Sequence, residues 1–116
     1  MSNPTEPTRQ QWLFLDDLRD PPDDQWVAAR SFADAVSHVT QHGIPDRISF
    51  DHDLGANVPT GHDFARWLIE QHLDGMQTFP KTFSYTVHSA NPPGAANIRG
   101  LLDGFLRVQL ESRTND

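Results

Sequence analysis

The feature that most constrains the fold is a short apolar run that ends abruptly in charged residues. Ile48-Ser49-Phe50 has the apolar, β-preferring character of a strand, and Asp51-His52-Asp53 follows at once. Two carboxylates and an imidazole at such a strand end must be solvated, paired with other groups or bound to a metal. In open α/β sheets, ligands bind in the crevice beyond the carboxyl ends of the strands. The alternative is that Asp51 and Asp53 only shape a turn and cap the next element.

Two other segments end in the same way, which favours a functional site. Trp12–Leu15 is an unbroken apolar run, as expected of a strand buried on both faces, and it stops at Asp16-Asp17. Lys81–Val87 alternates apolar and polar side chains, which is typical of an edge strand with one solvated face, and His88-Ser89-Ala90-Asn91 follows it. A further strand is expected at Trp26–Ala29.

Each of three helices is expected to follow a strand, and each has recognisable boundary residues. These are Ser31 with Asp34 and then Gly43 for the first helix, Thr60 with Asp63 and then Gly75 for the second, and Asn91-Pro92 for the third. The proline-rich link from Asp17 to Gln25 cannot hold a helix. Strands that alternate with helices predict an α/β fold with a four-stranded, mostly parallel sheet, and we expect the strand order 2-1-3-4.

The length of 116 residues is enough for one domain with a hydrophobic core. We expect a flexible lead-in over 1–11, a single domain over 12–111 and a polar tail over 112–116. The formal net charge of −7 argues against binding to duplex DNA or to an anionic membrane surface. The absence of cysteine, of a signal sequence and of a long apolar run predicts a soluble cytoplasmic protein.

With this strand order, the acids after the first and third strands lie side by side. Clustered carboxylates repel one another unless a cation lies among them, and oxygen-rich sites of this type suit Mg²⁺ or Mn²⁺. Nearby imidazoles favour Mn²⁺ or another transition-metal ion. We therefore expect Asp16, Asp17 and Asp51 to be metal ligands. Asp53 is either a further ligand or the group that orients His52.

Several other side chains near the strand ends are suited to handling a phosphate. Histidine is the side chain best suited to proton transfer around neutral pH, which makes His52 and His88 candidates for acid–base chemistry. Arg19 could hold a phosphate, or it could equally form a salt bridge with a neighbouring acid. Ser89 and the helix start at Asn91 offer a hydroxyl and backbone N–H groups to an anion, and His62 lies in the first turn of a helix near the cleft.

Four groups of residues occur together in this chain: Leu13-Phe14-Leu15-Asp16-Asp17-Leu18-Arg19 with Pro21, Ser49-Phe50-Asp51-His52-Asp53-Leu54-Gly55, Gly61-His62-Asp63, and His88-Ser89-Ala90-Asn91-Pro92-Pro93-Gly94 with Asn97-Ile98. In combination they resemble the family of cyclic-phosphate-processing receiver-like domains. The resemblance spans Trp12 to Leu106, which is nearly the whole expected domain.

This resemblance implies a receiver-like (flavodoxin-like) fold, either with three layers or truncated to two. It places Asp16 and Asp17 at the acidic pair of receivers and Asp51 at the phosphoacceptor position. It adds Asn97 to the candidate phosphate-binding residues. It also implies a metal-dependent site that acts on cyclic or terminal phosphates of RNA or nucleotides.

The chain departs from the pattern at two points. Position 62 is histidine where an aromatic residue such as tyrosine is expected, which could alter the pocket. The fifth strand of full receivers and its lysine are also missing, which argues against a conventional phosphoaspartate switch. Because the proline-rich link from Asp17 to Gln25 replaces the first helix of receivers, one face of the sheet is expected to be covered only by the carboxyl-terminal helix or by another subunit.

The leading hypothesis is a metal-dependent phosphoesterase, a hydrolase for RNA 2′,3′-cyclic phosphate ends or for cyclic nucleotides, with His52, His88 and Asp51 as its catalytic residues. The alternative is a non-catalytic receiver-like module that sequesters a phosphorylated nucleotide signal or a protein partner. A third hypothesis, a phosphoacceptor receiver, predicts phosphorylation of Asp51. A homodimer is compatible with each of the three.

Overall fold

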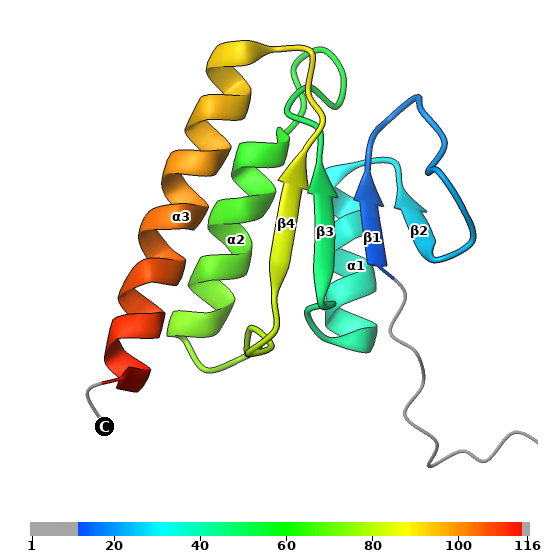
Figure 1. Cartoon of the computed structure of the whole chain (residues 1–116). Helices are drawn as coiled ribbons and strands as arrows, with labels where there is room; N and C mark the ends of the chain where they lie inside the picture. The colour runs from blue at the N-terminus through cyan, green and yellow to red at the C-terminus, as the bar shows by residue number, and fades with distance from the viewer. Residues whose placement is uncertain (1–11, 115–116) are drawn as a thin grey trace, which may run out of the picture.

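The computed structural model describes residues 12–114, and for 110–114 it describes the backbone alone. The expected lead-in over 1–11 lies outside the described residues. Strands and helices alternate as the sequence predicts (Figure 1). In chain order the elements are β1 (Trp12–Leu15), β2 (Trp26–Ala29), α1 (Phe32–His42), β3 (Arg47–Phe50), α2 (Gly61–Leu73), β4 (Ser84–Val87) and α3 (Pro92–Thr114).

The four strands form one sheet in the order β2-β1-β3-β4, and all three pairings are parallel. This confirms the α/β, flavodoxin-like (receiver-like) fold expected from the sequence. Leu15 is in register with Ala29 on one side and with Phe50 on the other, and Phe50 is in register with Val87. The carboxyl ends of all four strands therefore meet at one edge of the sheet.

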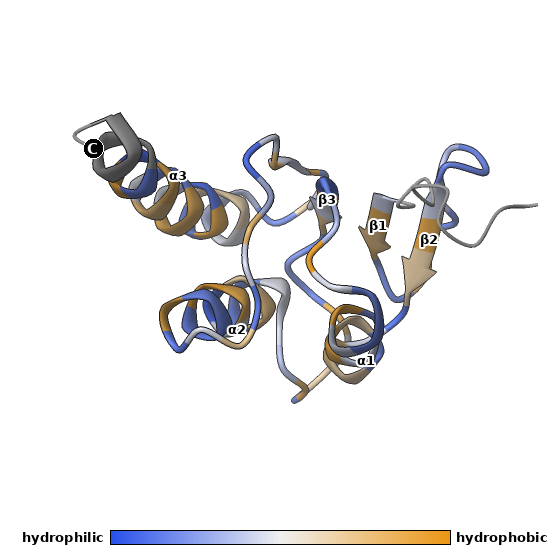
Figure 2. Ribbon diagram, turned by 90° about the horizontal axis from the view of Figure 1, so that it is seen from below, coloured by the Kyte–Doolittle hydropathy of each residue, from blue (hydrophilic) through white to orange (hydrophobic). Residues whose placement is uncertain are grey.

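The hydrophobic core lies between the sheet and the helices. Leu13 and Leu15 of β1 and Ile48 and Phe50 of β3 are fully buried. Figure 2 looks along the strands and has α1 and α2 on one side of the sheet, and α3 packs against α2 and β4. No helix of the described chain covers the opposite face. The fold is therefore the two-layer version of the two that were expected.

The three expected helix starts are present. The Ser31 side chain accepts a hydrogen bond from the backbone N–H of Asp34, and Thr60 and Asp63 form a reciprocal capping box. The Asn91 side-chain oxygen accepts from the N–H of Gly94, three residues on. Side-chain caps satisfy N–H groups that have no partner within the helix, so each helix begins at a fixed residue close to the carboxyl edge of the sheet.

The carboxyl-terminal helix is longer than the sequence suggested. α3 continues to Thr114, past residue 112 where we expected the polar tail to begin. It carries no proline beyond its first turn, so nothing in its backbone stops it earlier. No helix of the described chain combines the length and apolar character that crossing a membrane requires.

Candidate functional site

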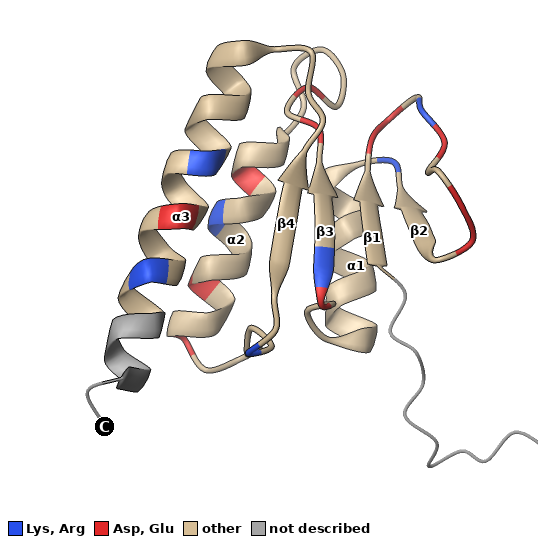
Figure 3. Cartoon of the chain, in the orientation of Figure 1, with Lys and Arg blue, Asp and Glu red and all other residues tan. Residues whose placement is uncertain are grey.

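Three strand ends bring two acids and one imidazole together. The first residues after β1, β3 and β4 are Asp16, Asp51 and His88. Their backbone N–H groups continue the parallel ladders by donating to Ala29, Leu15 and Phe50 at 2.9–3.0 Å. One potential ligand atom from each of the three side chains lies within 4.8 Å of the others. Figure 3 shows red segments directly after β1 and β3, at the edge where this cluster lies.

Asp16 is the buried member of the cluster, with an exposed fraction of 1%. Its Oδ1 accepts hydrogen bonds from the backbone N–H groups of Leu18 and Arg19, both at 2.8 Å, and its Oδ2 lies 2.9 Å from His88 Nε2. Burial alone raises the pKa of Asp16, but the two N–H groups and the His88 ring stabilise the carboxylate more strongly. The net pKa lies below the ordinary aspartate value, so Asp16 holds a fixed negative charge.

For Asp51, the contributions that raise the pKa outweigh those that lower it. Burial raises the pKa of Asp51, and the negative charge of Asp16 raises it further, against smaller opposing contributions from His88, the His52 backbone and Ser89. Two carboxylates this close resist ionising together unless a cation lies between them. The electrostatics of the pair therefore favour a positively charged ligand.

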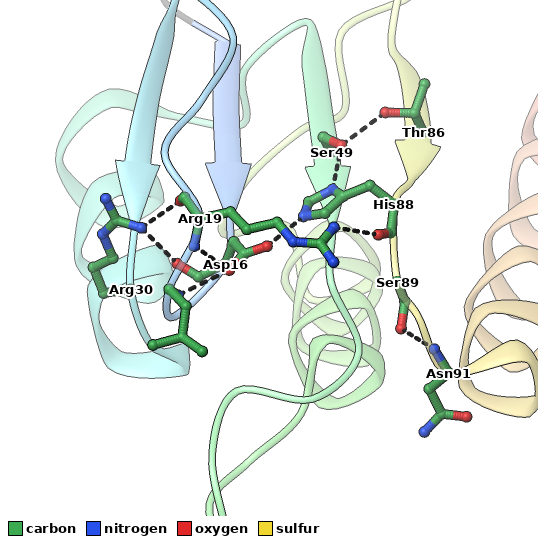
Figure 4. A network of polar contacts seen from close by, with 9 residues as sticks. Asp16, Arg19, Arg30, Ser49, Thr86, His88, Ser89 and Asn91 are labelled. Carbon is green, nitrogen blue, oxygen red and sulfur yellow. Dashed lines mark hydrogen bonds and ion pairs between the residues drawn. The ribbon is translucent and has the colours of Figure 1, made fainter.

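His88 is held on both ring nitrogens and on one ring face. Its Nδ1 lies 2.6 Å from Ser49 Oγ, and the Thr86 hydroxyl donates to the same Ser49 oxygen at 2.9 Å (Figure 4). The ring stacks on Phe14 with 4.4 Å between centroids and 5° between planes. These contacts fix the orientation of the imidazole before any ligand arrives.

The Ser49 hydroxyl can accommodate either neutral form of His88. If Ser49 donates to Nδ1, the imidazole hydrogen is on Nε2 and points at Asp16. If Nδ1 carries the hydrogen and donates to Ser49, the Nε2 lone pair faces the carboxylates instead, as metal binding requires. The polar pair formed by Ser49 and Thr86 is thus compatible with both the free and the metal-bound state.

A second polar group stands beside this cluster. His52 Nδ1 lies 3.0 Å from Asp53 Oδ1, and the Asn91 side-chain amide donates to Asp53 Oδ2 at 3.1 Å. The His52 ring packs so closely on the start of α3 that a Cβ on Gly94 would lie 2.4 Å from its Cγ. Asp53 therefore orients His52, which is one of the two roles expected for it. Both hydrogen bonds lower the pKa of Asp53, so this aspartate stays ionised.

The loop that carries these residues closes tightly on α2. The N–H of Gly61 donates to the carbonyl of His52 at 2.8 Å, and a Cβ on Gly61 would lie 1.9 Å from the Asp51 carbonyl oxygen. Only glycine permits this approach. The start of α2 therefore supports the backbone of Asp51 and His52 directly.

Two arginines, Arg19 and Arg30, contact the residues that follow β1 and β4. Arg19 Nη1 reaches the carbonyl oxygen of His88 at 3.4 Å, so this side chain extends across the site (Figure 4). No ion pair with a described residue holds Arg19. The ion pair with Asp20 is made instead by Arg30, which also donates to the backbone carbonyls of Asp16 and Arg19. Arg30 thus stabilises the loop, and the Arg19 side chain forms no ion pair with a described residue.

The start of α3 does not offer the backbone donors that we expected for an anion. Pro92 and Pro93 have no N–H, and the N–H groups of Gly94 and Ala95 already donate to the side chain and the carbonyl of Asn91. Among the expected phosphate-binding residues nearby, Ser89 keeps its hydroxyl next to Asp51, while it accepts a hydrogen bond from the N–H of Asn91.

The remaining candidates lie outside the three-residue cluster. Asp17 directly follows Asp16 but does not belong to the cluster. The sequence predicted Asp16, Asp17 and Asp51 as the metal ligands, and the third residue of the cluster is His88 instead of Asp17. His62 is half-buried in the first turn of α2, and Asn97 is exposed in the second turn of α3. No described hydrogen bond joins either of them to the cluster.

Sequence reasoning did not identify Ser49, Thr86 or Arg30. Ser49 had a usable signal, because it is the one polar residue inside an otherwise apolar strand end. The role of Thr86 depends on the register that places it beside Ser49. Arg30 gave no signal, because it follows a strand without any accompanying motif.

Comparison with known proteins gives one match. The sequence profile of the cyclic-phosphate processing receiver domain matches residues 12–104. Neither the curated proteins nor the solved structures contain a match. The matched range includes every residue of the cluster and both residues of the His52–Asp53 pair.

Proposed function

Because the chain belongs to the family of cyclic-phosphate processing receiver domains, we propose that it is a metal-dependent phosphoesterase for cyclic phosphates. The substrates that fit are RNA ends with a 2′,3′-cyclic phosphate and cyclic nucleotides. The observation that carries the proposal is the convergence of Asp16, Asp51 and His88 on one point at the carboxyl edge of the sheet.

The residues present suit a divalent metal. Two carboxylates and one imidazole supply oxygen and nitrogen ligands, a set suited to Mn²⁺ and also to Mg²⁺. Burial and the charge of Asp16 raise the pKa of Asp51, and a divalent cation bound beside the two carboxylates would offset their repulsion. A bound divalent ion would polarise a phosphoryl oxygen and stabilise the charge that develops on it.

The two histidines are suited to different tasks. Both nitrogens of His88 are engaged, by Ser49 and by Asp16, so we assign His88 to holding the metal. His52 is paired with a carboxylate through Nδ1, which leaves Nε2 for proton transfer. This arrangement of an imidazole oriented by an acid is typical of a general base.

Hydrolysis then requires one bond to form and one to break. A water oxygen attacks phosphorus and gives its proton to His52, and the bond from phosphorus to one ribose oxygen breaks. That oxygen takes a proton from solvent water and becomes a hydroxyl, His52 releases the proton it accepted to solvent, and the cyclic ester has opened to a monoester. We assign Arg19 and the Ser89 hydroxyl to holding the phosphate during this step.

The test is hydrolysis of a panel of 2′,3′- and 3′,5′-cyclic mononucleotides with added Mn²⁺, Mg²⁺ or chelator. We expect metal-dependent turnover that Asp51→Asn and His52→Gln each reduce by about a hundredfold or more. The matched control is Asp74→Asn, which removes one carboxylate from the exposed end of α2.

The outcomes separate the hypotheses. If no cyclic nucleotide is turned over faster than by the Asp51→Asn variant, the protein is not this enzyme. Tight nucleotide binding in calorimetry, with the ligand recovered intact after incubation with metal, would instead support a binding module. A gain in mass at Asp51 with a small phosphodonor would support a phosphoacceptor receiver.

A further inference from the structure

The side of the sheet opposite the helices has an unusual composition. We call it the open sheet face and define it by the strand side chains that alternate away from the core: Trp12, Phe14, Trp26, Ala28, Arg47, Ser49, Ser84 and Thr86. Within the described chain no helix lies over it (Figure 2). Trp12, Trp26 and Arg47 are half-buried, so each keeps part of its surface accessible.

A continuous row of rings crosses this face and begins at the candidate site. His88 stacks on Phe14, the Phe14 ring meets Trp26 edge-on at 5.9 Å, and Trp26 meets Trp12 at 5.1 Å. The first ring in the row is a member of the metal-binding cluster. A chain that leaves the cluster along the sheet would therefore run over aromatic surface.

Arg47 adds a positive charge to the same surface. Its guanidinium carbon lies 5.2 Å from the Trp12 ring centre and 5.8 Å from that of Trp26. No carboxylate of the described chain forms an ion pair with it, and its Nε is buried without a hydrogen-bond partner. In Figure 3, β3 is the one strand that carries a blue band. The eight side chains that define the face carry one positive charge and no negative charge, on a protein of net charge −7, and the neighbouring Asp46 is engaged by the Thr82 hydroxyl.

We propose that the open sheet face binds single-stranded RNA, whose cyclic end lies in the cluster and whose preceding nucleotides lie over Arg47 and the two tryptophans. The proposal rests on the proposed function, because it deepens the substrate class from a mononucleotide to a polynucleotide. Bases stack on indole rings and on guanidinium planes, and the phosphates between them are attracted to the arginine.

A second copy of the chain fits this face less well. In a two-fold dimer the same patch of both copies meets, so the two Arg47 side chains would approach and repel each other. None of the strand side chains that define the face carries a negative charge to offset that repulsion. A single-stranded nucleic acid supplies the negative charge that the face lacks and flat bases that can stack on its aromatic rings.

The experiment compares an RNA tetranucleotide that ends in a 3′-phosphate with the matching 3′-mononucleotide. Neither probe is hydrolysed, so binding is measured apart from turnover. We expect the tetranucleotide to bind about tenfold more tightly or better. Arg47→Gln should reduce this preference by about fivefold or more, a loss expected for a stacked arginine. Arg107→Gln, which removes the same charge from an exposed position on α3, should leave it unchanged.

Tryptophan fluorescence locates the bound RNA. The chain has three tryptophans, and Trp67 lies on α2, on the far side of the sheet. In a Trp67→Phe background, the remaining emission comes from Trp12 and Trp26, and the tetranucleotide should quench it more than the mononucleotide does. This readout also tests the surface if Arg47→Gln is too unstable to use.

Each contrary result has a distinct meaning. Equal affinity for the two probes, or equal effects of Arg47→Gln and Arg107→Gln, would overturn the RNA surface while cyclic mononucleotides could still be hydrolysed. A dimer in sedimentation that Arg47→Gln dissociates would assign the face to a second copy and overturn it too. If instead the tetranucleotide preference holds and no cyclic phosphate is hydrolysed, the surface stands and the proposed function fails.

Discussion

Asp16 Oδ2 and His88 Nε2 lie 2.9 Å apart, although 72 residues separate them in the chain. The contact follows from the strand order, because β1 and β4 both flank β3 and end at the same edge. Asp16 is held by two backbone N–H groups, and His88 is held by Ser49 and Phe14. In the proposed metal site, Asp16 and His88 would lose little conformational entropy on binding the ion, because each is already fixed by other parts of the fold.

Ser49→Ala should weaken metal binding, because it removes the partner of His88 Nδ1. Loss of such an orienting group typically costs about 10- to 100-fold in metal affinity. Calorimetric titration with Mn²⁺ measures the change, and the NMR signals of the His88 ring should broaden or move. Ser84→Ala removes the same hydroxyl from an exposed position one strand away and should have no effect. Equal affinities for all three proteins would show that Ser49 does not position His88.

Gly94→Ala should displace the His52 ring, because the new Cβ would lie 2.4 Å from its Cγ. We expect a loss of roughly 1–3 kcal/mol in the free energy of unfolding, as for other overpacked sites. Urea denaturation measures it. Gly100→Ala, in the same helix, meets nothing within 4 Å and should stabilise the protein by about 0.5–1 kcal/mol. If both substitutions stabilise, the close packing of His52 on α3 is wrong.

Asp51→Asn should make the metal-free protein more stable near neutral pH. Burial and the charge of Asp16 raise the pKa of Asp51, so ionised Asp51 is less favourable in the folded than in the unfolded state. In chelator, the wild type should therefore lose stability relative to Asp51→Asn as pH rises from the ordinary value of 3.8. Thermal melts over that range, with and without Mn²⁺, test this. The variant should also lose the stabilisation that Mn²⁺ gives the wild type. A variant less stable than wild type in chelator would contradict the prediction.

Tyr85 should ionise only at strongly alkaline pH. Burial and the nearby Asp103 carboxylate, which accepts its hydroxyl hydrogen, raise its pKa well above the usual 10.0. A raised pKa means that this contribution to stability is complete below pH 10 and is lost as pH rises through the folded-state pKa. Tyr85 is the single tyrosine of the chain, so tyrosinate absorbance reports on it alone. Tyr85→Phe should remove that part of the alkaline loss of stability, and ionisation at the ordinary pKa would refute the burial of the hydroxyl.

The fold was predictable because the strand patterns and the helix-capping residues indicate the same order of strands and helices. Trp12–Leu15 and Ile48–Phe50 are apolar enough to be central strands, and Lys81–Val87 alternates as an edge strand does, although only its second half pairs as β4. The capping residues fixed where the helices begin. The full length of α3 was not predictable, because a polar composition after residue 112 does not distinguish a solvated helix from a tail.

The site was predictable in part. That Asp16 and Asp51 would meet followed from strand order alone. That His88 rather than Asp17 would join them depends on which way each side chain leaves the end of its strand, and adjacent residues point in different directions. The pairing of Ser49 with His88 and Thr86 depends on the register of β3 against β4, which packing decides and no local pattern encodes. The missing N–H groups at the start of α3 were already evident in Pro92-Pro93.

The side chain of Asn91 caps α3 and also supports two residues outside that helix. Its oxygen holds the N–H of Gly94 while its amide holds Asp53, which in turn holds His52. If the first turn of α3 unwinds, the amide moves away and the acid–imidazole pair loses its anchor in the same event. Unwinding of this one helix terminus would therefore release His52, the imidazole that we propose as the proton acceptor.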